Sequence, residues 1–137
     1  MPDTLEQEVM VREDAAFGAF LAALADRGMV QIAGPSQAVH SAFRVALDTL
    51  QADEVLAPYF AHYFPSRITG RIDELDQALV RGESAGIVQY GNPTYSRIQI
   101  SLTPYEAEQL LNQFPDKREV LRVAAEVFEK RFRHASW

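Results

Sequence analysis

The sequence predicts an α+β fold, with one mostly helical domain and a small three-stranded antiparallel sheet. Three observations lead to this prediction. The length of 137 residues is typical of one domain with its own hydrophobic core. Apolar residues recur at helical spacing through most of the chain, but the period changes to two before residue 102, as in a strand with one buried face. We therefore expect a single domain over residues 1–137, with residues 1–12 as a loose polar arm.

The first part of the chain predicts four helices and one strand. Each predicted helix follows a residue whose side chain can cap the first turn, namely Asp14, Ser36, Asp53 and Ser66. Pro58 either kinks the third helix or belongs to its first turn, starting near Ala57. The predicted helices run from Asp14 to about Arg27, from Gln37 to Leu50, from Asp53 to Phe64 and from Arg67 to Arg81, and the strand covers 29–32.

The second part of the chain predicts a hairpin followed by two helices. Strands at Gly86–Tyr90 and Tyr95–Leu102 are joined by a Gly-Asn-Pro-Thr turn. The sequence Thr103-Pro104-Tyr105-Glu106 then predicts a capping box, in which the threonine hydroxyl and the glutamate pair with backbone N–H groups of the first turn. Pro115 ends that helix, and Asp116 caps a last helix through about His134.

Charge and composition argue against several classes of function. A net charge of −6 opposes non-specific binding to DNA or anionic lipid. There is no cysteine, which leaves the redox compartment open. No apolar run has membrane-spanning length and no secretory signal is present at the start, so we expect a cytoplasmic protein. The histidines at 40, 62 and 134 are far apart, and no catalytic or nucleotide-binding motif is present. We expect no metal, no cofactor, no catalytic residues and no enzymatic activity.

The segments SRITGRIDELDQALVRG and GIVQYGNPTYSRIQISLTPYEAEQLL resemble the recognition helix, wing and following helix of MarR-type winged-helix regulators. The resemblance covers residues 66–114 and implies a winged-helix-like topology, α-β-α-α-α-β-β-α-α, with a homodimer formed through the C-terminal helices. It also implies a nucleic-acid-binding or regulatory role, with a helix that presents its first residues to the major groove. The implied contacts are Arg67, Thr69 and Arg71 on the helix, and Gln89, Asn92, Tyr95 and Arg97 on or near the wing.

The alternative is a non-enzymatic protein-interaction or assembly protein that binds no nucleic acid. Residues 66–98 carry four arginines and four carboxylates, whereas a surface that binds DNA should be locally positive. The aromatic run at 59–64 suggests a pocket or partner surface that includes Tyr59, His62 and Tyr63. The same run also fits a structure in which both tyrosines lie in the core and the histidine faces solvent.

Overall fold

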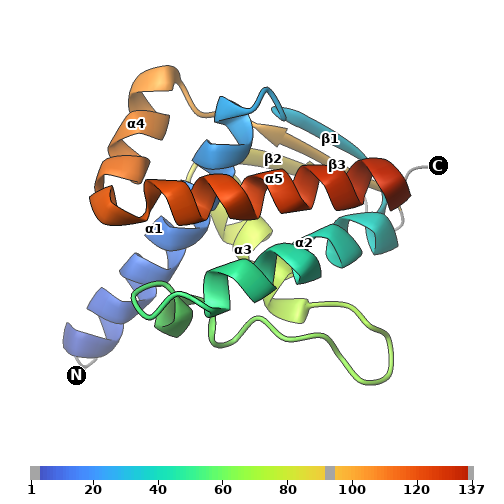
Figure 1. Cartoon of the computed structure of the whole chain (residues 1–137), viewed down its shortest axis with the longest axis horizontal. Helices are drawn as coiled ribbons and strands as arrows, with labels where there is room; N and C mark the ends of the chain where they lie inside the picture. Colours follow the sequence, from blue (N-terminus) through green and yellow to red (C-terminus); the bar gives the residue numbers. More distant parts are fainter. Residues whose placement is uncertain (1–3, 92–94, 136–137) are drawn as a thin grey trace.

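The computed structural model describes the backbone of residues 4–91 and 95–135 and the side chains of residues 12–90 and 97–134. The predicted class is confirmed, because helices dominate the chain and surround one small antiparallel sheet (Figure 1). The elements are α1 (Thr4–Asp26), β1 (Gln31–Pro35), α2 (Ser36–Gln51), the 3₁₀ turn η1 (Ala57–Phe60), α3 (Asp73–Ser84), β2 (Val88–Gly91), β3 (Tyr95–Ile100), α4 (Pro104–Asn112), the 3₁₀ turn η2 (Pro115–Lys117) and α5 (Arg118–Ala135).

The sheet has the order β1-β3-β2, so the last strand in sequence lies between the other two. Both neighbours pair with it in antiparallel register, and Gln99 of β3 lies opposite Gln31 on one side and Gln89 on the other. The two faces of the sheet differ, as a period of two requires. Ile32, Ile98 and other apolar residues point into the core, while the glutamines are exposed.

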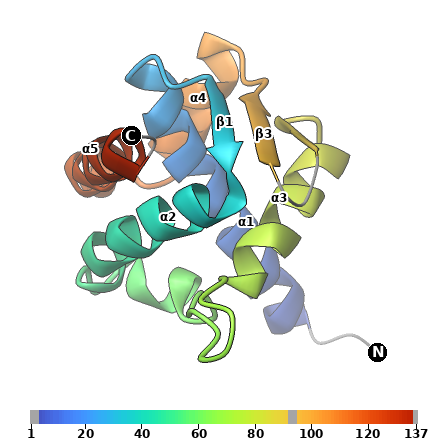
Figure 2. The same cartoon turned by 90° about the vertical axis from the view of Figure 1, so that its right-hand side faces the viewer.

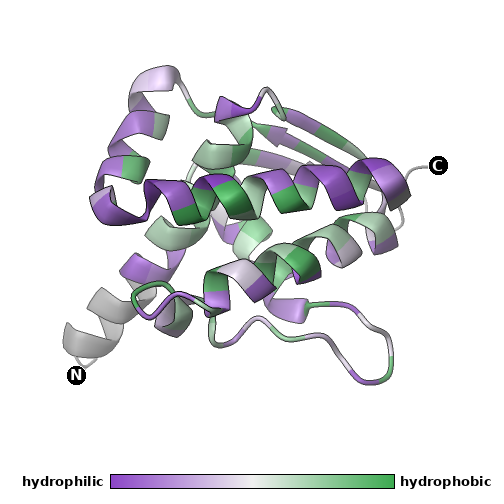
Figure 3. Ribbon diagram, in the orientation of Figure 1, coloured by the Kyte–Doolittle hydropathy of each residue, from purple (hydrophilic) through white to green (hydrophobic). Residues whose placement is uncertain are grey.

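The core is built around α1, whose residues 15–24 are all buried. Phe20 of α1 makes edge contacts with Phe43 of α2 and Phe128 of α5, at ring-centroid distances of 5.4 and 5.9 Å. Figure 3 shows that α5 alternates between hydrophobic and hydrophilic residues along its length, as expected for a helix with one side on the core. No helix in the described part of the chain is long and apolar enough to cross a membrane.

The first helix begins earlier than its predicted start at Asp14, because α1 begins at Thr4 and passes through residues 4–12, where the sequence predicts a polar arm or a loosely held first turn. The segment contains no glycine or proline, and six of its nine residues are good helix formers, namely Leu5, Glu6, Gln7, Glu8, Met10 and Arg12. Once the buried part of α1 is folded, each further residue adds a hydrogen bond at little cost, so the helix extends toward the N-terminus. Asp14 therefore lies inside the helix and not at its cap.

The helix predicted from Asp53 to Phe64 is reduced to the single turn η1, with Pro58 near its start, as in the shorter alternative. Asp53 does cap a turn, since its carboxylate accepts hydrogen bonds from the N–H groups of Val55 and Leu56. The Gln51 side chain donates to the carbonyls of Phe60 and Tyr63, at 2.9 and 3.2 Å. In a continuing helix these carbonyls would accept N–H groups of the next turn, but here they accept hydrogen bonds from the Gln51 side chain.

The next helix begins at Asp73, six residues after its predicted start. Ser66 caps only a turn, in which its hydroxyl accepts hydrogen bonds from the N–H groups of Ile68 and Thr69. Gly70 then takes a left-handed conformation with φ of 75°, which interrupts the helical backbone. Ile68, which lies in this turn, is 94% exposed.

The C-terminal end of α3 also differs from the prediction. The helix continues through Gly82 to Ser84, and a Cβ at Gly82 would come within 2.8 Å of the Val88 side chain. This glycine therefore allows β2 to pack closely on the helix and does not end it.

The remaining elements lie close to their predicted positions. β1 occupies Gln31–Pro35 in place of 29–32, and both hairpin strands fall within their predicted segments or one residue beyond. α2 begins at Ser36, which is buried, and Pro35 occupies the cap position without a side-chain cap hydrogen bond. The capping box is confirmed, with the Thr103 hydroxyl 3.1 Å from the Glu106 nitrogen and the Glu106 carboxylate 3.0 Å from the Thr103 nitrogen.

Candidate functional site: the polar face of the sheet

The residues predicted to bind nucleic acid divide into two groups in the structure. Arg67, Thr69 and Arg71 lie in the loop before α3, and none of them belongs to a helix. Gln89 and Arg97 lie on β2 and β3, on the exposed side of the sheet. Asn92 lies outside the described residues, as does the side chain of Tyr95. In the described part of the chain, the three loop residues therefore do not form the start of a recognition helix.

A groove of about 540 Å³ crosses the exposed side of the sheet. This volume lies within the range of small-ligand sites. The register places Gln31, Gln99 and Gln89 in one row across the three strands, and Ala33 beside Arg97 in the next row. Residues from all three strands and from α3 line the groove, namely Gln31, Ile32, Ala33, Glu83, Gln89, Tyr90, Arg97, Ile98 and Gln99.

The groove combines polar and apolar surface, and its charges are close to balanced. Its charged lining residues are one cation, Arg97, and one anion, Glu83. The Glu83 carboxylate accepts a hydrogen bond from the Tyr90 backbone N–H at 3.0 Å, on the outer side of β2. Because the Tyr90 N–H is already paired in this way, an additional strand could not use it as a hydrogen-bond donor. The outer edge of β2 is therefore poorly suited to pairing with another strand. The amide row can both donate and accept hydrogen bonds, which suits a polar, uncharged ligand surface.

A second polar cluster, which we call the His40 network, lies between α2, α3 and β2. His40 is only 4% exposed, and its Nδ1 accepts a hydrogen bond from the Ile72 N–H at 2.9 Å. Its Nε2 therefore carries the proton and donates to Asp76 at 3.2 Å. Asp76 also accepts hydrogen bonds from Arg71, at 2.9 Å, and from the Tyr90 hydroxyl, at 3.0 Å.

The His40 network holds a neutral imidazole against a charged carboxylate. Burial lowers the pKa of His40 below its ordinary value of 6.5, and this effect outweighs the Asp76 carboxylate, which favours the protonated ring. Burial raises the pKa of Asp76, but the Arg71 hydrogen bond, His40 and Tyr90 together bring it below 3.8. Both ring nitrogens of His40 are occupied, so His40 is poorly placed to act as a base or a metal ligand.

The predicted pocket residues Tyr59, His62 and Tyr63 lie in different surroundings. Tyr63 is buried among Phe17, Phe43 and Phe60, and its burial raises the pKa of its hydroxyl. Tyr59 packs edge-on against Phe114 on a different part of the core. The His62 side chain is 72% exposed and lines a separate hollow of about 300 Å³. This arrangement agrees with the alternative that placed the tyrosines in the core and the histidine in solvent.

The helix before the hairpin is acidic where a recognition helix would be positive. The first turn of α3 contains Asp73, Glu74 and Asp76. Its basic residue, Arg81, is engaged by Asp14 at 2.9 Å and by Glu74 at 2.7 Å. Among the described residues, no group of histidines and carboxylates is arranged to hold a metal ion.

Sequence reasoning found part of the sheet site and missed the His40 network. The alternation at 98–102 already placed Arg97 and Gln99 on the wet side of their strand. Gln31 could not be connected to them, because nothing local shows that β1 pairs with β3. His40 and Asp76 are 36 residues apart, and no spacing rule links them.

Comparisons with known proteins found no family, no curated protein and no solved structure that matches this chain. The function therefore has to be inferred from the residues themselves.

Proposed function

We propose that this chain is a non-enzymatic protein-interaction domain on a winged-helix-like frame, and that it binds an extended segment of a partner protein across the polar face of its sheet. The observation that supports this proposal is the row of Gln31, Gln99 and Gln89 along the floor of a groove that crosses all three strands. Peptide backbones present alternating donors and acceptors, which side-chain amides can match.

The charge of the groove favours a peptide over a nucleic acid. Nucleic-acid affinity depends mainly on several cations that neutralise phosphates, and this groove contains Arg97 alone, opposed by Glu83. The acidic first turn of α3 argues in the same direction. The order helix, hairpin and capped helix agrees with the winged-helix resemblance, but a fold does not determine what is bound. DNA binding, a homodimer through the C-terminal helices and a cytoplasmic location remain predictions.

The proposal is tested by selecting random displayed peptides on the native protein. We expect enriched peptides whose affinity falls about tenfold or more on Gln99→Lys, since this change places a charge in the centre of the amide row. Gln109→Lys on α4 is the matched control, because it adds the same charge at an exposed glutamine outside the groove. Peptides that bind both variants equally would contradict the sheet site.

The nucleic-acid alternative is tested separately by gel shift with sheared genomic DNA at about 50 mM salt, where phosphate contacts are strongest. We expect no retention. Retention that weakens steeply with salt and is lost in Arg97→Glu would overturn the protein-interaction proposal in favour of nucleic-acid binding.

A further inference from the structure

The loop between η1 and α3 presents an isoleucine to solvent in an ordered turn. The two large apolar side chains that this loop exposes are Ile68, which is 94% exposed, and Phe64, which is 67% exposed. Figure 2 shows this loop projecting at the bottom of the view, away from the sheet and α4. We call residues 64–71 the 64–71 loop. Large apolar side chains exposed on a projecting element are typical of contact sites.

The 64–71 loop is held in shape by its own hydrogen bonds. The Ser66 N–H donates to the Arg71 carbonyl at 2.8 Å, and the Gly70 N–H donates to the Ser66 carbonyl at 2.9 Å. The Ser66 hydroxyl accepts two more N–H groups, and Arg71 ties the end of the loop to Asp76. A segment that is already ordered loses little conformational entropy on binding, so Ile68 is preorganised as a contact residue.

A complementary hollow lies between α1 and α4, which we call the α1–α4 groove. Its volume is about 270 Å³, and most of its lining is apolar, including Val30, which is 43% exposed. Its ionisable lining residues are both acidic: Asp26, and Glu108, which also pairs with Arg118. The full lining is Ala22, Ala25, Asp26, Val30, Leu102, Thr103, Pro104, Ala107, Glu108 and Leu111.

The loop and the groove match in polarity and in charge. Arg67 lies next to Ile68 in the loop, and Asp26 lies on the rim of the groove. Within the described part of the chain, no ion pair engages either Arg67 or Asp26. Figures 1 and 2 both place the loop and α4 at opposite sides of the molecule, so a loop cannot reach the groove of its own chain.

We propose that the 64–71 loop of one copy docks into the α1–α4 groove of a second copy, with Ile68 in the groove and Arg67 beside Asp26. Because the two surfaces differ, the contact is head-to-tail and leaves a free loop at one end and a free groove at the other. One loop in one groove buries less than the roughly 1,200 Å² of a stable interface, so the association is weak and depends on concentration. This contact is independent of the sheet groove.

Sedimentation velocity from about 10 μM to about 1 mM tests the contact, over the range where weak self-association becomes measurable. We expect the wild type to grow beyond two chains as the concentration rises. Ile68→Asp should weaken association about tenfold or more, because it places a charge in an apolar groove. Val80→Asp is the matched control, since Val80 is 53% exposed on α3 and lines neither surface.

A mixing experiment distinguishes head-to-tail contact from any symmetric dimer. Ile68→Asp disables the loop, and Ala107→Arg disables the groove, so each variant alone should remain monomeric. Their mixture still has one intact loop and one intact groove, so it should form a heterodimer and nothing larger. Circular dichroism checks that both variants are folded. In a separate test, each of the single changes Arg67→Glu and Asp26→Arg should weaken association, and the two changes combined in one chain should restore it.

The outcomes that overturn the proposal are distinct. At about 1 mM even weak complexes form to a measurable extent. A wild type that stays monomeric at this concentration would therefore rule out self-association. Growth that stops at two chains, or a mixture that behaves like its separate components, would reject the head-to-tail contact. Gln99→Lys should leave the sedimentation unchanged, so failure here and failure of the sheet site can be told apart.

Discussion

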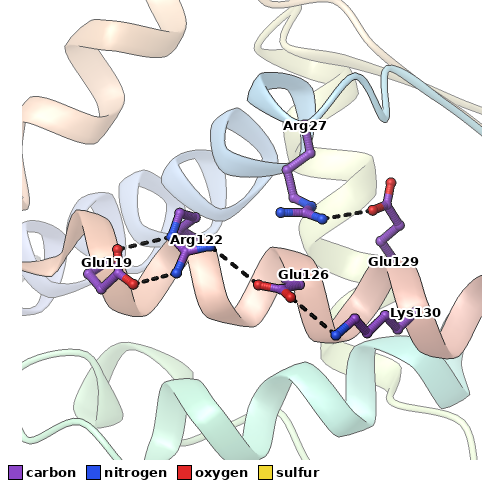
Figure 4. Close-up of polar contacts among 6 residues, drawn as sticks. All are labelled: Arg27, Glu119, Arg122, Glu126, Glu129 and Lys130. Atoms are coloured by element: carbon purple, nitrogen blue, oxygen red, sulfur yellow. Dashed lines mark hydrogen bonds and ion pairs between the residues drawn. The ribbon is translucent and has the colours of Figure 1, made fainter.

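Two polar networks in this molecule use similar side chains in different surroundings. The His40 network joins α2, α3 and β2, and its members are largely shielded from water, with Asp76 28% exposed. The second network lies along the outer side of α5, where Glu119, Arg122, Glu126 and Lys130 pair in sequence (Figure 4). The contrast predicts that burial, more than the number of ion pairs, decides how much stability is lost when one member of a network is removed.

The largest expected effect follows from removing the centre of the His40 network. Asp76→Ala should lower the free energy of unfolding by about 2–4 kcal/mol, because it leaves the partly buried donors of His40, Tyr90 and Arg71 without their acceptor. Urea denaturation followed by circular dichroism measures the change. The matched control is Asp73→Ala, which removes a carboxylate from the same first turn of α3 but is expected to cost less than about 1 kcal/mol. Equal losses in the two variants would show that the network contributes only through the helix dipole.

The second prediction tests the His40 network by lowering the pH and needs no substitution. Because burial lowers the pKa of His40 in the folded state, the unfolded chain binds its proton first as the pH falls below 6.5. The stability from this site is therefore complete above pH 6.5 and decreases below it. Between about pH 7.5 and about pH 5.5, we therefore expect the free energy of unfolding to decrease, with the decrease confined to the range below about pH 6.5.

The pH measurement needs a control for other groups. Burial raises the pKa of Glu13, which works in the opposite sense as the pH approaches 4.5, so the range ends above that value. His40→Gln should show a flatter dependence over the same range. A direct titration of the His40 ring by NMR in the native protein should give a value below 6.5, and a higher value would contradict the neutral, buried imidazole.

The contrast between short-range and long-range contacts also explains which parts of the fold the sequence predicted. The capping box and the hairpin depend on residues a few positions apart, so Thr103 and Glu106 were sufficient to place the start of α4. The segment from Asp53 to Ile72 has equally good helical spacing, but it forms a turn and a loop. Its backbone groups are engaged by Gln51 and His40, whose positions depend on the tertiary structure.

The candidate site was predictable only in part for the same reason. Period-two alternation assigned Arg97 and Gln99 to the exposed side of β3. The row with Gln31 and Gln89 requires the order β1-β3-β2, which no local pattern contains. The contacts inferred from the resemblance at Arg67 and Thr69 assumed a helix, and Gly70 prevents one there.

The smallest expected effects compare two arginines that differ in burial. Arg122 pairs with two carboxylates, Glu119 and Glu126, but its side chain is 50% exposed. Among the described residues, Arg27 has one ion-pair partner, Glu129, at 2.9 Å. Both side chains are less than one third exposed, at 27% and 15%, where the end of α1 meets α5 (Figure 4). Counting ion pairs predicts that Arg122→Ala is the more damaging change, whereas burial predicts the reverse.

We expect Arg27→Ala to lower the free energy of unfolding by about 1 kcal/mol, through the lost pair and the lost packing of its side-chain stem. For Arg122→Ala we expect no change in the urea midpoint beyond experimental error, because solvent and salt already screen its partners. Repeating both measurements in about 0.5 M salt should leave the Arg27 difference largely intact, since partly buried pairs are screened less. If Arg122→Ala proves the more destabilising of the two, the surface network on α5 contributes to stability and burial alone does not rank the ion pairs of this protein.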